Sequence, residues 1–132
     1  MSRPRFLRSQ FKKQQREAND AAKLRGAEVC GLILDNGSFL ELVQLRNKSK
    51  RGGGFSFYFS EVRAIRKWAS LCNHEIVGTF HSHPLGLPTP GQSDLRNAVD
   101  DSLMLIFDVL GHSAQLWHVK DSVPRRMAFY LL

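Results

Sequence analysis

The spacing of hydrophobic and polar positions divides the chain into alternating helical and extended segments. Apolar residues at roughly helical spacing predict a helix over residues 9–25, with Ser9 as its N-cap and Gly26 just after its last turn. The apolar face of this helix is weak, which predicts loose packing or contact with a partner. A near-continuous apolar run over Glu28–Leu34 predicts a strand that is buried on both faces, and a turn leads from it into a second strand over Phe39–Leu45.

The rest of the chain continues this alternation. A polar, basic, glycine-rich loop over Asn47–Gly54 is predicted to be mobile, and Phe55–Phe59 is predicted to form a short strand whose phenylalanines pack in the core. Further elements follow: helices over Glu61–Asn73 and about Gly91–Asp100, a strand over Glu75–His81, a hairpin of Leu103–Leu110 and Ala114–Lys120, and a last strand or helix turn over Met127–Leu131. This order predicts a single-domain α/β fold with a mixed β-sheet flanked by helices.

Composition narrows the class of protein. The chain has 132 residues, of which 42% are hydrophobic and 23% charged, a balance that suits one globular domain and excludes general disorder. No segment reaches the roughly 18 consecutive apolar residues needed to span a bilayer, and the N-terminus lacks the apolar stretch of a secretory signal. Cys30 and Cys72 are too few for a disulfide framework and are expected to be inert buried thiols. We therefore expect a soluble, cytoplasmic protein without a membrane partner.

The net charge of +7 is concentrated near the N-terminus. Residues 1–25 carry eight basic and two acidic side chains, whereas the other 107 residues carry eleven basic and ten acidic ones. A DNA-binding domain usually carries basic surface on its folded body, so this distribution argues against nucleic acid as a partner. We interpret residues 1–25 as a basic helical segment and residues 26–132 as the main domain, which contains the candidate catalytic residues described below. The segment is expected to be solvated or to dock on an acidic protein.

The pattern with the clearest chemical meaning runs from His81 to Asp94. Side chains at positions i and i+2 of a strand point to the same face, so His81 and His83 can present two imidazoles to one metal. A proline-rich loop then leads to a helix that brings Asp94 back. Two nitrogens and one carboxylate oxygen, with a fourth position for water, are typical of a catalytic zinc site. The alternative interpretation is that the histidines are buried polar residues or turn formers.

A metal-bound water also needs a base. Glu28 is the candidate, because it opens an apolar strand where burying a carboxylate without a function is costly. The alternative is that Glu28 is a solvated residue at the start of a strand.

Together these residues resemble the JAMM (MPN+) zinc metalloprotease motif, E…H-x-H-x7-S-x2-D. Asp94 follows His83 by eleven residues, and the likeness extends over about residues 20–120. The resemblance implies a JAMM/MPN fold with a cytidine-deaminase-like architecture, Zn²⁺ held by His81, His83 and Asp94, and Glu28 as the general acid/base. It also implies a deubiquitinase-like peptidase or isopeptidase that acts after the C-terminal glycine of a ubiquitin-like protein or its conjugates.

One position departs from this motif. Gly91 stands where the family has a serine that supports the oxyanion, and losing one such donor typically costs about 10²–10³ in rate. A second interpretation is therefore a catalytically weak or silent, zinc-stabilised module that binds a ubiquitin-like partner. A zinc deaminase would need H-x-E with P-C-x-x-C, which the chain lacks, and RadC-type proteins share a loop like His81–Pro90 but usually carry Asn at the position of Ser82. The resemblance also implies that a strand over Phe55–Phe59 lines the substrate groove.

Overall fold

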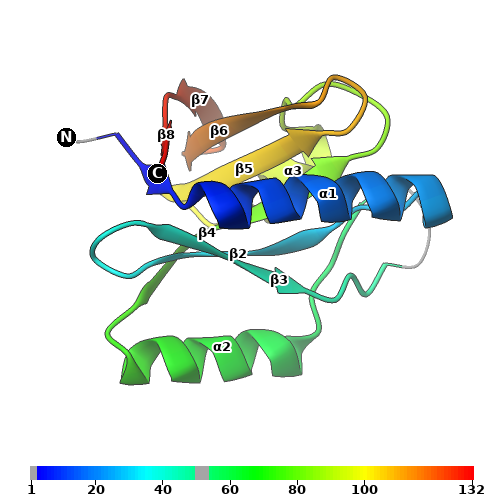
Figure 1. Ribbon diagram of the computed structural model, residues 1–132. Coiled ribbons are helices and arrows are strands. Elements are labelled where there is room, and N and C mark those ends of the chain that lie inside the picture. Colours follow the sequence, from blue (N-terminus) through cyan, green and yellow to red (C-terminus); the bar gives the residue numbers. More distant parts are fainter. Residues whose placement is uncertain (1–2, 50–53) are drawn as a thin grey trace.

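A central β-sheet organises the chain in the computed structural model, which describes residues 3–49 and 54–132 (Figure 1). In chain order its elements are β1 (Arg5–Phe6), α1 (Arg8–Arg25), β2 (Cys30–Asp35), β3 (Leu40–Leu45), α2 (Phe59–Leu71), β4 (Glu75–His83), α3 (Gln92–Asn97), β5 (Ser102–Asp108), β6 (Ser113–Lys120), β7 (Val123–Met127) and β8 (Tyr130–Leu131). The sheet has the strand order β7-β6-β5-β4-β2-β3-β1-β8. The pairs β2–β3, β2–β4, β5–β6 and β6–β7 are antiparallel. Strands β4 and β5 run parallel, with α3 in the connection between them, and β1 runs parallel to both of its neighbours. The predicted mixed sheet flanked by helices is confirmed.

Alternation along the strands assigns a helix to each face of the sheet. Ile33, Phe80 and Leu105 belong to the same core cluster as the buried residues of α1. Leu32 and Leu34 pack with α2 on the other face, as successive side chains of a strand must. His81 pairs in register with Cys30 of β2 on one side and Ile106 of β5 on the other. The C-terminal end of β4 thus carries its histidines in the middle of the sheet.

Helix α1 is an integral part of the core, so the loose packing predicted for it is wrong. Phe11, Ala18 and Ala21 are at most 4% exposed, and the Phe11 ring lies 5.1 Å from the Phe107 ring of β5. Small alanines let the helix approach the sheet closely, so Phe11 is the one large apolar side chain among its buried residues. The division into residues 1–25 and 26–132 stays a prediction, although both parts contribute to one core.

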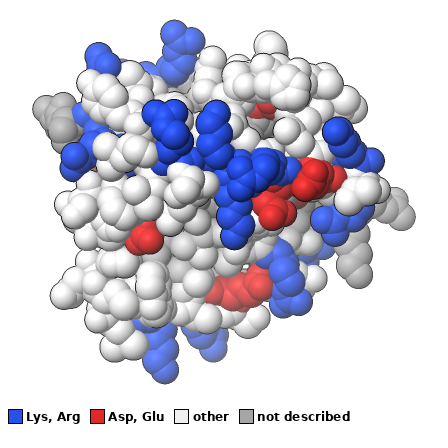
Figure 2. Space-filling model, viewed as in Figure 1, with Lys and Arg blue, Asp and Glu red and all other residues white. Residues whose placement is uncertain are grey.

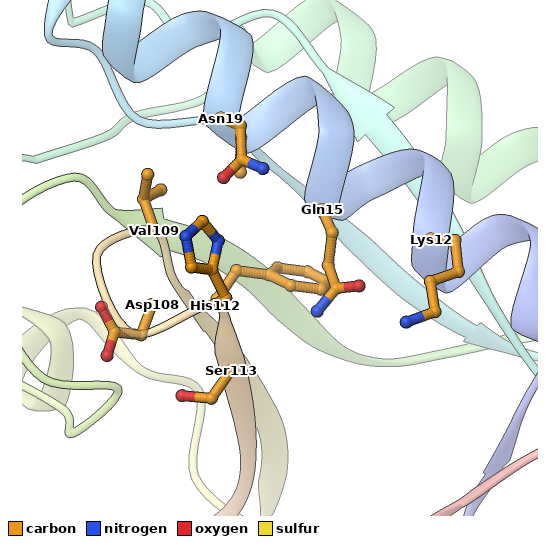
Figure 3. A pocket seen from close by; sticks show the side chains of 9 residues that line it. Lys12, Gln15, Asn19, Asp108, Val109, His112 and Ser113 are labelled. Carbon is orange, nitrogen blue, oxygen red and sulfur yellow. The ribbon is translucent and has the colours of Figure 1, made fainter.

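The basic side chains of α1 and its N-terminal extension remain outside this core. All eight Lys and Arg residues of the segment are exposed, and Figure 2 shows a band of them across the α1 face, interrupted by acidic side chains. A cavity of about 200 Å³ lies between α1 and the adjoining ends of β5 and β6. Lys12, Asn19, Asp108 and His112 lie around this cavity (Figure 3).

Truncating Phe11 tests whether α1 stabilises the fold. We expect Phe11→Ala to lower the free energy of unfolding by about 3–5 kcal/mol, because the substitution leaves a cavity between helix and sheet. Lys13→Ala, an exposed change on the same helix, is the control and is expected to shift stability by less than about 0.5 kcal/mol. Urea unfolding followed by circular dichroism measures both. Equal midpoints for the two variants would mean that α1 does not contribute to the core.

The segment before α2 differs from its prediction. Phe55–Phe59 is not a strand: residues 54–58 are irregular and α2 begins at Phe59. The three phenylalanines also have different environments, because Phe55 stacks on His81, Phe57 packs against the α2 cluster and Phe59 is 70% exposed. Core packing is therefore confirmed for Phe57 and wrong for Phe59. Half of the loop that was predicted to be mobile, residues 50–53, lies outside the described residues.

Smaller differences concern element ends and short strands. Gly26 ends α1 in a left-handed conformation with φ of 59°, as predicted, but the N-cap is Leu7 rather than Ser9. Helix α3 is shorter than predicted, and β4 continues through His83. The two-residue strands β1 and β8 pair with each other and are too short to leave a periodic signal. Within the described residues, no helix is long and apolar enough to cross a membrane.

Candidate metal centre

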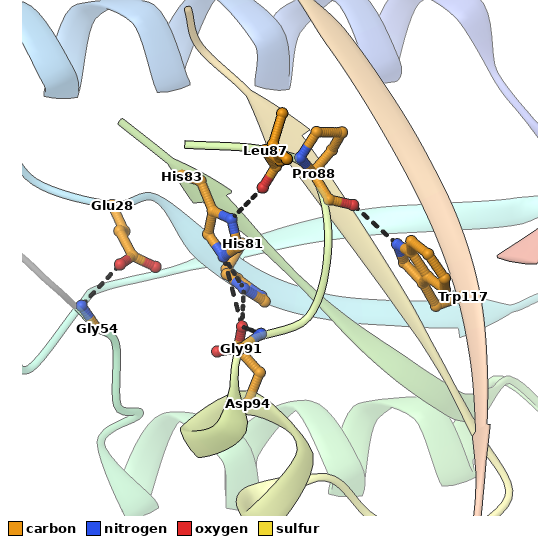
Figure 4. A network of polar contacts seen from close by, with 9 residues as sticks. All are labelled: Glu28, Gly54, His81, His83, Leu87, Pro88, Gly91, Asp94 and Trp117. Carbon is orange, nitrogen blue, oxygen red and sulfur yellow. Dashed lines mark hydrogen bonds and ion pairs between the residues drawn. The ribbon is translucent and has the colours of Figure 1, made fainter. Parts of the chain in front are cut away.

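The structure brings His81, His83 and Asp94 together at the C-terminal end of β4 (Figure 4). His81 is fully buried and His83 lies at the last position of the strand. Asp94 lies in the first turn of α3, whose start is folded back against β4 by the proline-rich loop. Glu28 comes from the segment before β2 and its side chain lies beside the histidines (Figure 4). All four residues singled out in the sequence therefore meet at one place.

The distances among the three side chains fit a metal ion. His81 Nε2 and His83 Nε2 are 3.1 Å apart, and Asp94 Oδ2 lies 3.3 Å from the first and 3.4 Å from the second. A tetrahedral zinc with bonds of about 2.0–2.1 Å separates its ligand atoms by about 3.3 Å. Two imidazole nitrogens and one carboxylate oxygen thus occupy three corners of such a site and leave the fourth corner for water.

Hydrogen bonds orient His83 and set the charge of Asp94. His83 Nδ1 lies 2.7 Å from the Leu87 carbonyl oxygen, so Nδ1 donates and Nε2 is the nitrogen that faces the centre. The hydrogen bond that Asp94 accepts from His83 raises the pKa of His83, an effect that burial partly opposes, so a metal ion must displace a proton from Nε2. Burial acts to raise the pKa of Asp94, but hydrogen bonds from His81 and His83 outweigh it and hold that pKa well below its usual range. Asp94 is therefore a carboxylate.

His81 is held by packing rather than by a second hydrogen bond. Its Nδ1 is buried and has no hydrogen-bond partner within the described part of the chain. The Phe55 ring stacks on the imidazole at 4.6 Å between centroids, with 27° between the planes. This contact was not predicted, because Phe55 and His81 are brought together only by the tertiary fold.

A tryptophan anchors the loop that orients His83. Trp117 Nε1 on β6 donates to the Pro88 carbonyl oxygen at 2.9 Å, next to the Leu87 carbonyl that accepts from His83 (Figure 4). The Trp117 ring packs against the cluster that includes Leu95 of α3. Sequence reasoning missed Trp117, because nothing in its local pattern distinguishes it from any other aromatic residue on a strand.

Glu28 has the environment expected of a general base. It is 8% exposed, and burial raises the pKa of its carboxyl despite the nearby His81. The Gly54 N–H donates to Glu28 Oε2 at 2.6 Å. A carboxyl whose pKa is raised toward neutrality transfers protons more effectively at that pH. The interpretation of Glu28 as a solvated residue does not fit this burial.

Two hydrogen-bonding side chains fix the position of Glu28. Ser82, between the two histidines, accepts at Oγ from the Val29 N–H at 2.9 Å, and its own N–H donates to the Val29 carbonyl oxygen. Asn47 Nδ2 donates to the carbonyl oxygens of Glu28 at 3.0 Å and Gly54 at 3.3 Å. Ser82 therefore ties Glu28 to the strand with the histidines, and Asn47 ties it to the loop. Neither role was predicted from the sequence.

Gly91 is the N-cap of α3, and its N–H donates to Asp94 Oδ2 at 2.9 Å. A Cβ added at this position would meet only Asp94 Oδ2 within 4 Å, at 3.6 Å, which is ordinary van der Waals contact. The backbone φ of −81° suits any residue. The fold thus has room for a serine here. Ser93 is exposed and does not take its place.

The two cysteines differ, which corrects the expectation that both are buried. Cys30 is buried next to His81, whereas Cys72 is exposed. Burial raises the pKa of Cys30 to about 12, so its thiol is protonated at neutral pH and unsuited to hold a metal.

We expect iodoacetamide at pH 8 to modify Cys72 and leave Cys30 intact in the native protein. Peptide mass spectrometry reads out both sites, and rapid alkylation of Cys30 in the folded chain would contradict its burial.

Comparisons with known proteins identify the family and similar folds. A family model described as prokaryotic homologs of the JAB domain matches residues 9–126. Solved structures with a similar fold include a protein from Desulfitobacterium hafniense (21% identity, TM-score 0.81, covering 97% of this chain and 92% of that one). A JAB1/MPN domain protein from Archaeoglobus fulgidus is also similar (17% identity, TM-score 0.60, covering 96% of this chain and 98% of that one). A structure described as a metalloprotease-like zinc site in the proteasome and signalosome is similar as well (12% identity, TM-score 0.56, covering 99% of both chains). No curated protein matches the chain.

Proposed function

Because the chain belongs to the prokaryotic homologs of the JAB domain, we propose that it is a zinc-dependent metallopeptidase or isopeptidase. The observation that carries this proposal is the convergence of three ligand atoms within 3.1–3.4 Å of one another beside the buried Glu28. His81, His83 and Asp94 are the proposed zinc ligands, and Glu28 is the proposed general acid/base. A purely structural metal site would have no use for a base, so Glu28 favours an enzyme.

Each residue has a defined task in the proposed reaction. When bound, Zn²⁺ supplies Lewis acidity and a water whose pKa is lowered toward neutrality. Glu28 accepts the proton of the attacking water and then donates it to the amine that leaves. Leu87, through His83 Nδ1, orients the lone pair of His83. We propose that N–H groups at the start of α3, which lack partners within the helix, take over part of the role of the missing serine.

The proposed substrate is a ubiquitin-like protein or its conjugates, cleaved after a C-terminal glycine. The family resemblance supports this substrate, and the fold is shared with a structure described as a metalloprotease-like zinc site in the proteasome and signalosome. We also propose a cytoplasmic location, which the unpaired Cys30 and Cys72 support. The exposed basic residues of segment 1–25 favour docking on an acidic protein.

Zinc reconstitution tests the proposed function. The chain is stripped with a chelator, reloaded with one equivalent of Zn²⁺, and incubated with fusions of several ubiquitin-like proteins that end in Gly-Gly. We expect cleavage only by the reloaded protein, with the product ending in glycine by mass spectrometry. Zinc binding without cleavage of any fusion would instead favour the second candidate, a silent module that binds a ubiquitin-like partner, for which Gly91 is the specific observation.

Restoring the serine of the motif is expected to raise activity. Gly91→Ser should increase kcat by about tenfold or more, because one donor toward the developing oxyanion is typically worth about 10²–10³ in rate and helix α3 already supplies some N–H groups. The space around Gly91 accommodates the side chain. Gly91→Ala adds the Cβ without the hydroxyl and is the matched control, expected to leave kcat at or below that of the wild type. If both variants have the same kcat, the hydroxyl has no role in this chain.

A further inference from the structure

A cleft of about 670 Å³ adjoins Glu28, and neither His81 nor His83 is among the residues that line it. Among the residues around it are Arg25 at the end of α1, Gln44 and Arg46 at the end of β3, and Tyr58 before α2. The register of the sheet gives the order in which the histidines, Glu28 and the cleft lie. Cys30 of β2 pairs with His81 of β4 on one side and with Leu45 of β3 on the other. The histidines, Glu28 and the cleft therefore follow one another across the ends of β4, β2 and β3.

The edge of β3 that borders the cleft is open. Strand β1 pairs with β3 only at Leu40. Leu42 N–H points away from β2, because it donates to the side chain of Gln10 at 3.1 Å, and Arg46 N–H likewise donates to Glu61 at 3.1 Å. Because outward amides alternate along an antiparallel strand, the N–H and C=O of Gln44 also point outward. Gln44 is exposed; it pairs with Gly31 of β2 on its inner side, and within the described residues no strand pairs with it on its outward side.

We propose that this cleft binds the part of the substrate on the amine side of the cleaved bond. This segment would lie there as an extended strand paired with β3 at Gln44. The inference rests on the proposed function: Glu28 gives its proton to the leaving amine, so the polypeptide attached to that amine continues past Glu28, away from the histidines and into the cleft. Pairing with an exposed strand edge is an established mode of peptide recognition. Bond cleavage transfers water across the amide, giving a carboxylate on one product and a free amine on the other.

The charges around the cleft favour acidic side chains in this segment. Arg46 is paired with Glu61 at 2.9 Å, and the Glu28 carboxylate accepts from Gly54. Arg25, in the last turn of α1, makes no ion pair among the described residues. Among the described residues that line the cleft, it is thus the cation that remains available for a carboxylate of the bound chain.

Peptide binding tests the inference without requiring hydrolysis. The probe is Ala-Glu-Val-Glu-Ala with a free N-terminus and a C-terminal fluorescein, titrated with the full chain and followed by anisotropy. Gln44→Pro removes the outward N–H at an edge position where proline is tolerated, and Gln44→Ala keeps it. We expect Gln44→Pro to weaken binding by about tenfold, the equivalent of one hydrogen bond, and Gln44→Ala by less than about twofold. Probes that are N-methylated at single amides test the same pairing without altering the protein. Methylation should weaken binding at every second amide, because only those amides face β3.

The role of charge is tested with the basic probe Ala-Lys-Val-Lys-Ala. It should bind the wild type more weakly than the acidic probe does, whereas Arg25→Ala should bind the two probes with equal affinity. Binding that is insensitive to both Gln44→Pro and N-methylation, or no binding to the wild type, would overturn the inference. If fusions are cleaved and KM is unchanged in Gln44→Pro, the inference fails while the proposed function stands. If no fusion is cleaved but the pattern of peptide binding holds, the cleft is supported and the proposed function fails.

Discussion

Glu28→Gln is expected to lower kcat for hydrolysis by about 10²–10⁴-fold, the range attributed to general acid–base catalysis. The variant should still bind one Zn²⁺ per chain, because the ligands His81, His83 and Asp94 are untouched. Its amide oxygen can keep the hydrogen bond that the Gly54 N–H makes with Oε2 at 2.6 Å. The change therefore removes proton transfer while preserving the shape of the site. Single-turnover cleavage of a Gly-Gly fusion, with zinc content by mass spectrometry, measures both properties.

A matched control separates the loss of a base from the loss of a negative charge. Glu41 lies on β3 with its carboxylate 3.5 Å from His74, and Glu41→Gln is expected to leave kcat within about twofold of the wild type, as for most changes remote from a site. Equal rates for wild type and Glu28→Gln would assign the proton transfer to another group. Loss of zinc from Glu28→Gln would show instead that Glu28 supports the metal directly.

Asp94→Asn is expected to weaken zinc binding by more than about 10²-fold, beyond the 10–100-fold cost typical of residues that only support metal ligands. The substitution keeps the size of the side chain but removes the charge that two histidines and the Gly91 N–H surround. Zinc should stabilise the wild type by about 2.7 kcal/mol when its free concentration is 100 times Kd. It should leave the unfolding temperature of Asp94→Asn nearly unchanged at the same concentration. Competition with a chelating dye and thermal unfolding provide the two measurements.

The control for this variant is another aspartate that faces a histidine. Asp101 Oδ1 lies 2.7 Å from His118 Nε2 on the surface, and Asp101→Asn is expected to leave zinc affinity unchanged. If Asp94→Asn retains full affinity, the metal is not held by the three proposed ligands. If the two variants lose affinity equally, the effect is one of general stability or net charge.

The candidate site was predictable from the sequence because its three proposed metal ligands lie close together in the chain. His81 and His83 share a strand face by simple alternation, and Asp94 follows within the next helix. Glu28 was found because a carboxylate beside an apolar strand is unusual. The contacts that hold these residues in place were not predictable in the same way. Phe55 on His81, Trp117 on Pro88 and Asn47 on the Glu28 carbonyl join distant parts of the chain, and no local pattern encodes such contacts.

Packing explains the predictions about the fold that were wrong. The weak apolar face of α1 contains Ala18 and Ala21, whose small side chains permit close contact with the sheet. Alternating phenylalanines suggested a strand over residues 55–59, but Phe55 and Phe57 contact a histidine and a helix cluster instead. In both cases tertiary contacts outweigh the preference that a short window expresses.

The three proposed ligands lie within one short stretch of chain, residues 81–94, whereas Glu28 reaches them only through the pairing of β2 with β4 and the contacts of Ser82 with Val29. Closing that long loop is entropically costlier than folding the stretch that carries the ligands. The three ligands are therefore close together in the chain, whereas the proposed base joins them only through long-range pairing within the sheet.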